Sequence, residues 1–160
     1  MPLIELSTLI CAPRERVFDL ARSIDAHQDS TEETRERAVG GVTKGLIGLN
    51  GEVTWEARHL GVTQRLSVRI TAFDRPHHFQ DVMISGAFKR MIHDHDFSDH
   101  PDGTLMNDRF EFESPFGILG KVADRLFLGG YMRRFIIRRN EVLKRLAESD
   151  EWSRYLEHVS

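Results

Sequence analysis

The segment KRMIHDHDFSDHPDGTLMNDRFEFES, residues 89–114, decides the fold. Residues 89–98 and 104–114 each alternate with a period of two, which is typical of a half-buried β-strand. The five residues between them, DHPDG, have the composition of a turn. Two alternating runs joined by a short turn predict an antiparallel hairpin, so this part of the chain belongs to a sheet.

The pattern on either side of this hairpin predicts the remaining elements. Alternation predicts further strands at residues 3–10, 35–39, 53–59, 66–70 and 78–85. Between the first two of these, Pro13 opens a short helix over 13–22, and 25–33 is consistent with a second one. An apolar stripe with helical spacing runs over 117–147, which as one helix would be about 45 Å long, with a bend at Gly129-Gly130.

This order of elements predicts an α+β fold, in which about seven strands form a curved antiparallel sheet around a long C-terminal α-helix. Two short helices follow the first strand. Only the last helix is long enough to cover the inner face of the sheet. Because a curved sheet holds its centre away from that helix, we expect a cavity for an apolar ligand between them.

The composition is that of an ordinary globular domain. The chain has 160 residues, of which 40% are hydrophobic, and a net charge of -3. This charge argues against nucleic acid as a partner. The single cysteine, Cys11, cannot form an intramolecular disulfide. The sequence shows no signal-peptide pattern and no apolar run of about 18 residues, so we expect a cytoplasmic protein without stable membrane insertion.

Four phrases of this sequence resemble the START/Bet v 1-type superfamily, also called SRPBCC or polyketide-cyclase-like, and most resemble a bacterial ligand-binding subfamily of it. They are APRERVFDLARSID (12–25), EVTWEARHL (52–60), DRPHHFQDVMISGAFKRMIHDHDF (74–97) and TLMNDRFEFESPFGILG (104–120). The resemblance implies a helix-grip fold, with one ligand-binding domain over residues 1–147 and a tail over 148–160. It also implies binding or transport of hydrophobic molecules, while a minority of members are cyclases, aromatases or hydrolases; the fold alone does not name the ligand.

Polar residues on the decisive hairpin are the candidates for chemistry. Symmetric pairing about its turn gives three facing pairs: His95 with Asp108, His93 with Phe110, and Phe97 with Met106. A three-residue loop before this hairpin would place Asp81 opposite His93, whereas a two-residue loop would place Gln80 there. We favour Asp81, because the glycine in this loop makes a bulge easy.

Three interpretations of His93, His95, Asp81 and Asp108 remain open. They form a buried hydrogen-bond network, they also orient a ligand carbonyl or hydroxyl, or they act as a metal site or a catalytic acid–base cluster. Because H-x-H on a strand is a weak metal signal, we expect neither a metal nor a cofactor. Arg139, on the last helix, is a candidate counter-charge for a ligand carboxylate.

Ten apolar side chains are expected to line the cavity: Trp55, Val68, Met83, Met91, Phe97, Met106, Phe110, Phe112, Leu126 and Phe135. The favoured function is binding or transport of a lipid, isoprenoid, polyketide or aromatic metabolite. The alternative is a cyclase-, dehydratase- or hydrolase-type enzyme that uses the His/Asp cluster. A homodimer through an exposed sheet edge is a further option.

Overall fold

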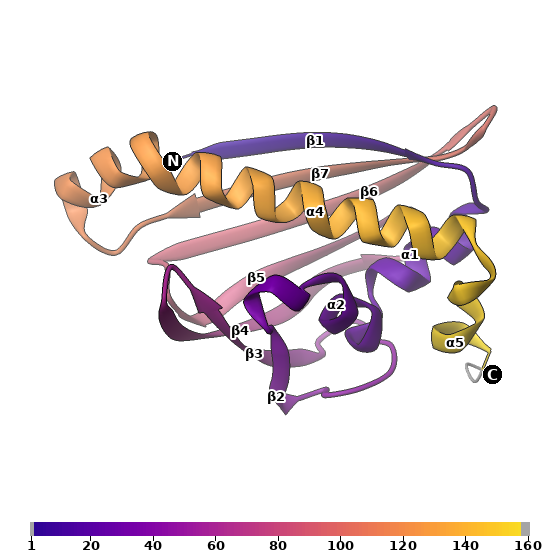
Figure 1. Ribbon diagram of the computed structural model, residues 1–160, viewed down its shortest axis with the longest axis horizontal. Helices are drawn as coiled ribbons and strands as arrows, with labels where there is room; N and C mark the ends of the chain where they lie inside the picture. The colour runs from indigo at the N-terminus through magenta and orange to yellow at the C-terminus, as the bar shows by residue number, and fades with distance from the viewer. Residues whose placement is uncertain (1, 158–160) are drawn as a thin grey trace.

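Seven antiparallel strands form one sheet, and a long C-terminal helix lies across its inner face (Figure 1). The computed structural model describes residues 2–157, apart from the side chains of Asp124 and Arg125. The strands are β1 (Leu3–Ile10), β2 (Arg37–Gly41), β3 (Glu52–His59), β4 (Val62–Asp74), β5 (His78–Gly86), β6 (Arg90–His100) and β7 (Gly103–Glu113), in the sheet order β1-β7-β6-β5-β4-β3-β2. The predicted helix-grip architecture is confirmed.

The helices cluster at the start and at the end of the chain. They are α1 (Arg14–Ala21), α2 (Ile24–Ser30), the 3-10 turn η1 (Glu32–Thr34), α3 (Gly117–Ala123), the π-helical turn η2 (Asp124–Leu128), α4 (Gly129–Glu148), the 3-10 turn η3 (Asp150–Trp152) and α5 (Ser153–Leu156). Pro13 precedes α1 in an extended conformation, and the Ser23 side chain caps α2 by accepting a hydrogen bond from the Ala26 amide at 3.1 Å. No helix of residues 2–157 is long and apolar enough to cross a lipid bilayer.

Several element boundaries differ from the sequence prediction; β4, for example, runs over Val62–Asp74, where a strand was predicted only at residues 66–70. Arg35 was expected to start a strand, but it adopts a left-handed conformation with φ of 51° at the end of η1, and β2 begins only at Arg37. The last helix is interrupted by η2 directly before the predicted bend at Gly129. A π-helical turn breaks the regular hydrogen-bond ladder, so α3 and α4 are separate helices.

The tail after α4 folds back onto α1 and α2. The Arg16 guanidinium lies 4.2 Å from the centre of the Trp152 ring, and the Tyr155 hydroxyl donates to Asp29 Oδ2 at 2.5 Å. Residues 158–160 of the predicted tail lie outside the described part of the chain.

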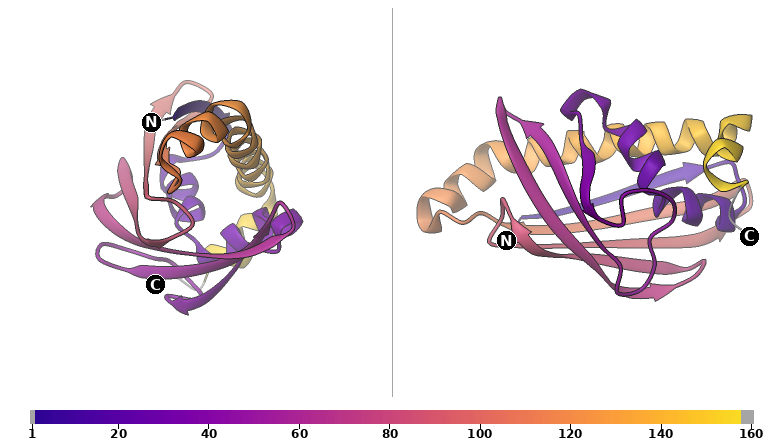
Figure 2. Two further views of the ribbon diagram at one scale, coloured as in Figure 1. Left: turned by 90° about the vertical axis from the view of Figure 1, so that its left-hand side faces the viewer. Right: turned by 90° about the horizontal axis from the view of Figure 1, so that it is seen from below.

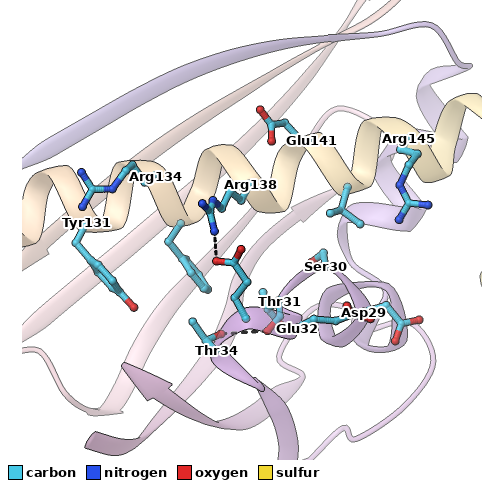
Figure 3. Close-up of a pocket in the computed structure, with 13 residues that line it drawn as sticks. Asp29, Ser30, Thr31, Glu32, Thr34, Tyr131, Arg134, Arg138, Glu141 and Arg145 are labelled. Carbon is cyan, nitrogen blue, oxygen red and sulfur yellow. Dashed lines mark hydrogen bonds and ion pairs between the residues drawn. The ribbon is translucent and has the colours of Figure 1, made fainter. Parts of the chain in front are cut away.

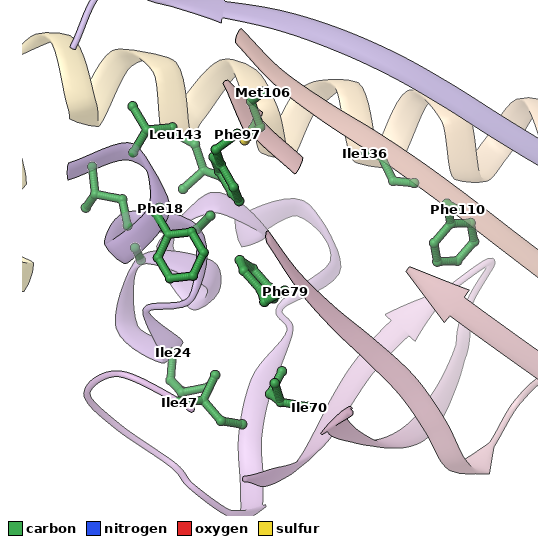
Figure 4. Close-up of a cluster of buried hydrophobic side chains, with 14 of the residues drawn as sticks. Phe18, Ile24, Ile47, Ile70, Phe79, Phe97, Met106, Phe110, Ile136 and Leu143 are labelled. Carbon is green, nitrogen blue, oxygen red and sulfur yellow. The ribbon is translucent and has the colours of Figure 1, made fainter. Parts of the chain in front are cut away.

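The space between the sheet and α4 is filled at the α1 end. Phe18 of α1 is fully buried, and its ring makes edge-on contacts with Phe73, Phe79 and Phe97 at centroid distances of 5.1–5.5 Å (Figure 4). The two views in Figure 2 show the sheet curving past α4, with α1 at one end and α3 at the other. The side chains of α1 therefore fill the interior at one end of the curved sheet, and the cavity lies at the other end, next to α3.

Candidate functional site

Along β6, the inward-facing side chains change from lining the cavity to packing in the core. Met91 and His93 line the cavity, His95 lines a smaller void beneath it, and Phe97 packs against Phe18. Because side chains alternate along a strand, these four residues share one face. His93 thus lies at the floor of the cavity and His95 directly beneath it, where the hollow part of the interior meets the filled part.

A hydrogen-bond network connects this floor across three strands and α4. His93 Nε2 lies 2.8 Å from Asp108 Oδ1 on β7, and His95 Nε2 lies 2.9 Å from Asp81 Oδ1 on β5. Asn140 of α4 donates its Nδ2 to Asp108 Oδ2 at 2.6 Å. His95 Nδ1 is 3.2 Å from Asp108 Oδ1 without hydrogen-bond alignment. Asp108, whose side chain is fully buried, is the centre of this network.

The strand register explains the connectivity. His95 faces Asp108 and His93 faces Phe110, as the symmetric pairing predicted, and on its other side His93 faces Asp81, as the favoured length of the preceding loop predicted. The hydrogen bonds of the two imidazoles run to the diagonal neighbours on the adjacent strands, which long side chains reach. Gln80 turns to the outer face, where its Nε2 donates to Asp94 Oδ1 at 2.8 Å. The register therefore resolves the earlier alternative in favour of Asp81.

Burial and close pairing set the protonation states of the four groups. Burial would raise the pKa of Asp108, but the hydrogen bond with His93 and the close approach of His95 hold it well below its usual range. The pKa of Asp81 is lowered in the same way against the effect of burial, chiefly by its hydrogen bond with His95. Both side chains are therefore carboxylates at neutral pH and act only as acceptors.

The two histidines shift in opposite directions. Burial and the charge of His95 lower the pKa of His93. Burial also lowers the pKa of His95, but the carboxylates of Asp108 and Asp81 outweigh it and raise that pKa above its usual value. The ring centres are 3.8 Å apart, so two imidazolium charges would repel strongly. The arrangement favours a protonated His95 beside a neutral His93.

Above this floor lies a cavity of about 490 Å³ between the sheet and the helical segments α3 to α4. Most of its walls are apolar: Trp55, Ala57, Leu60, Leu66, Val68, Ala87, Phe88, Met91, Phe110, Pro115, Phe116, Ala123, Phe127, Leu128, Met132, Phe135 and Ile136. Asp81, His93 and Arg139 provide polar groups at its floor, and the rest of the lining adds His27, Glu36, His59, Gln64, Arg65 and Ser114. A void of about 80 Å³ shares the three floor residues and adds His95. Predominantly apolar walls with a smaller number of polar groups are typical of small-molecule sites.

The mouth of the cavity faces α3. Leu60, Phe116 and Phe127 line the cavity, yet they are 71%, 75% and 72% exposed. They belong to the turn between β3 and β4, the segment before α3, and η2. The opening therefore lies between that turn and the α3–η2 segment.

A second pocket of about 530 Å³ lies outside, between α4 and the α2–η1 segment (Figure 3). Its lining includes Arg134, Arg138 and Arg145 on α4 and Asp29, Glu32 and Glu33 on the other wall, and Arg138 forms an ion pair with Glu33. Phe135 lines both this groove and the cavity. Its charged lining makes the groove a poor match for an apolar ligand, so the cavity is the candidate site.

Known structures share this architecture. The protein TTHA0849 of Thermus thermophilus superposes with a TM-score of 0.75 at 20% identity, covering 99% of this chain and 100% of that one. The START superfamily protein of Mycobacterium smegmatis gives 0.68 at 13% identity, covering 91% and 97%. Ginseng major latex-like protein 151 of Panax ginseng also gives 0.68 at 13% identity, covering 92% and 97%. The chain has a START/Bet v 1-like fold. At these identities the likeness establishes the fold alone. No protein-family model matches the sequence, and neither does any curated protein.

The START/Bet v 1-like fold brings five of the ten predicted lining residues to the cavity: Trp55, Val68, Met91, Phe110 and Phe135. The prediction was wrong for Phe97 and Met106, which lie in the filled half of the interior (Figure 4), and for the fully buried Phe112, whose ring is 5.3 Å from that of Phe88. Met83 packs on the core beside the cavity without lining it. Leu126 is 68% exposed, and its neighbour Phe127 lines the cavity instead.

Several polar residues around the site escaped the sequence analysis. Asn140 donates a hydrogen bond to Asp108. The sequence could have indicated this residue, because it is a polar residue four positions after Ile136, on the buried side of the last helix. His27 stacks on Trp55 at 4.1 Å and hydrogen-bonds to Glu36, but it lies in a polar stretch with no pattern to indicate this. His59, which contacts the Tyr131 hydroxyl at 2.8 Å, also lines the cavity.

The geometry of the floor suits proton transfer better than metal binding. Among the described residues, Asp81, His93 and His95 bring potential ligand atoms within 4.8 Å of one another. The two imidazole planes are tilted by 34°, and both Nε2 atoms already contact carboxylates, so neither Nε2 is free for a metal ion. Because ionised Asp108 accepts the proton of His93 Nε2, the neutral ring of His93 carries its lone pair on Nδ1, which makes no hydrogen bond within the described residues.

Proposed function

We propose that this protein is a cytoplasmic binding or transport protein for a hydrophobic small molecule, such as a lipid, isoprenoid, polyketide or aromatic metabolite. The observation that carries the proposal is the cavity of about 490 Å³ with predominantly apolar walls and a mouth on the α3 side. Its volume lies within the range of about 300–1,000 Å³ that is usual for ligand pockets. The START/Bet v 1-like fold supports the same class of ligand.

The test combines native mass spectrometry with displacement of a neutral dye. Protein purified without detergent is expected to carry a small molecule that is lost on denaturation, and the emptied protein is expected to bind Nile red. Ala57, a buried residue of the cavity wall, offers a direct control. Ala57→Phe should weaken dye binding at least about tenfold by filling the cavity, whereas Val39→Phe on the short edge strand β2 should not.

Two results would contradict the binding function. One is the lack of both a co-purified molecule and dye binding in the wild-type protein. The other is dye binding that Ala57→Phe leaves unchanged, because the dye would then occupy some other surface.

A second candidate function, acid–base catalysis, rests on one specific observation. Neutral His93 is held by Asp108 and carries a free Nδ1 lone pair at the cavity floor, next to the cationic Arg139. This arrangement suits abstraction of a proton beside a ligand carbonyl. The C–H bond would break, its proton would pass to His93 Nδ1, and the electron pair would move onto the carbonyl oxygen as an enolate.

Deuterium exchange tests this candidate without knowledge of the natural substrate. In D₂O, the acetyl group of acetylnaphthalene should take up deuterium faster with the protein than in buffer. His93→Ala should remove the acceleration at a temperature where the variant is still folded, while His78→Ala, which replaces a histidine on the outer face paired with Asp96, should keep it. Exchange at the buffer rate would leave the network with a binding or structural role only.

A further inference from the structure

Arg139 is a buried cation whose guanidinium makes no hydrogen bond with the described residues. The residue lies on α4, is 4% exposed, and lines both the cavity and the smaller void beneath it. Its Nη1 atom is 3.9 Å from Asp108 Oδ1, an ion-pair distance that is too long for a hydrogen bond, and no described residue accepts a hydrogen bond from it.

A guanidinium group has five N–H donors and cannot lose its charge at physiological pH. Leaving such donors unpaired in a protein interior is costly unless something else accepts their hydrogen bonds. The protein aims these donors into a hollow, so the acceptor is supplied by whatever occupies the floor of the cavity, either water or an oxygen atom of the ligand.

The charges around Arg139 determine which oxygen suits it. Asp81 and Asp108 carry one negative charge each, and the directions of their pKa shifts keep them ionised. Arg139 carries one positive charge, and His95, whose pKa the two carboxylates raise, adds at most one more, while the pKa of His93 is lowered. The floor therefore has no excess of positive charge before any ligand enters. A ligand carboxylate would bring a third negative charge close to two others, whereas an uncharged carbonyl would bring none.

We propose that Arg139 is the polar anchor of the ligand, and that the cavity prefers apolar molecules with an uncharged carbonyl oxygen over the corresponding carboxylates. This inference rests on the proposed binding function and names the chemistry of its ligand. It also revises the expectation from the sequence, in which Arg139 was matched with a ligand carboxylate.

Three probes of equal shape separate the possibilities: acetylnaphthalene, naphthoate and ethylnaphthalene, substituted at the same ring position. Their affinities are measured by Nile red displacement and by calorimetry at neutral pH. Acetylnaphthalene should bind about tenfold more tightly than ethylnaphthalene, as expected for one hydrogen bond from a charged donor. Naphthoate should bind more weakly than acetylnaphthalene by a similar factor.

The variant Arg139→Met tests the assigned residue. It should abolish the advantage of acetylnaphthalene over ethylnaphthalene and leave ethylnaphthalene binding within about twofold. Arg138→Met is the matched control, because Arg138 is adjacent in the chain but exposed and paired with Glu33, and it should keep the wild-type order of affinities. If Arg139→Met fails to fold, Arg139→Gln replaces it, because glutamine removes the charge and retains an amide donor. The order of the three affinities in the wild-type protein tests the carbonyl preference in either case.

Several outcomes would overturn the inference. Tighter binding of naphthoate than of acetylnaphthalene would indicate an anion site. Equal binding of acetylnaphthalene and ethylnaphthalene would overturn the carbonyl preference while leaving the proposed hydrophobic binding intact. Binding of none of the probes, together with no dye binding, would overturn both proposals. An unchanged order of affinities in Arg139→Met would assign the preference to another residue.

Discussion

Replacing Asp108 by asparagine should destabilise the protein strongly, although the shape of the side chain is kept. Asp108 accepts hydrogen bonds from His93 and Asn140 and lies 3.2 Å from His95 Nδ1 and 3.9 Å from Arg139 Nη1. An asparagine at this position has one acceptor oxygen, so its amino group must face one of the two donors. The substitution leaves a buried donor unpaired and removes the negative charge that balances its neighbours.

The magnitude follows from these lost contacts. A hydrogen bond to a charged group contributes roughly 1.5–3 kcal/mol, and removing one partner of a buried ionic network costs about 3–5 kcal/mol. We therefore expect Asp108→Asn to lower the free energy of unfolding by about 3 kcal/mol, measured by guanidinium chloride unfolding at pH 7. Asp99→Asn is the matched control, because the Asp99 side chain is 78% exposed and 3.6 Å from Arg14, and it should cost less than about 1 kcal/mol.

The same experiment has a defined pH dependence. The pKa of Asp108 is well below the value of about 3.9 that an unfolded chain has, so its stabilising contribution is present above that value and is lost as the pH falls toward the native pKa. Because Asp108 also raises the pKa of His95, the stability difference between wild type and Asp108→Asn should increase as the pH falls from 7 to about 5, and it should shrink below about pH 4. A loss at pH 7 no larger than that of Asp99→Asn, or a difference that does not shrink below about pH 4, would refute the assignment of Asp108 as the ionised centre of the network.

Three further predictions concern the rest of the fold. Gly103→Ala should lower the free energy of unfolding by about 2 kcal/mol or more, because φ is 145° and the new methyl group would collide with the backbone at the end of β1. Gly48→Ala, with open space around the residue, should be nearly neutral, and equal effects of the two substitutions would contradict this prediction. Phe18→Ala should cost about 3–5 kcal/mol yet leave Nile red affinity unchanged, since Phe18 does not line the cavity. A bound ligand should alter the fluorescence of Trp55 in the cavity wall, so Trp55→Phe should remove the signal and Trp152→Phe should keep it.

Local patterns were sufficient to predict the sheet and much of its register. The turn at 99–103 and the alternation around it placed His95 opposite Asp108, because the pairing of a hairpin follows from its turn and its period of two. The choice between Asp81 and Gln80 depended on the length of the preceding loop, which the pattern left open and the structure resolved. The polar cluster was predictable for the same reason, since its members lie on three consecutive strands.

The sequence by itself determined which side chains point inward, but not what they meet there. Phe97 and Met91 have the same orientation on β6, yet one packs against Phe18 and the other lines the cavity. That difference depends on where α1 docks, a contact between segments about eighty residues apart that no local period encodes. Likewise, Arg139 is one of many arginines in the sequence, and only the packing of α4 over the sheet makes it a buried cation facing a hollow. Alternation is a property of the backbone, whereas the place where an interior stays empty depends on how whole elements fit together.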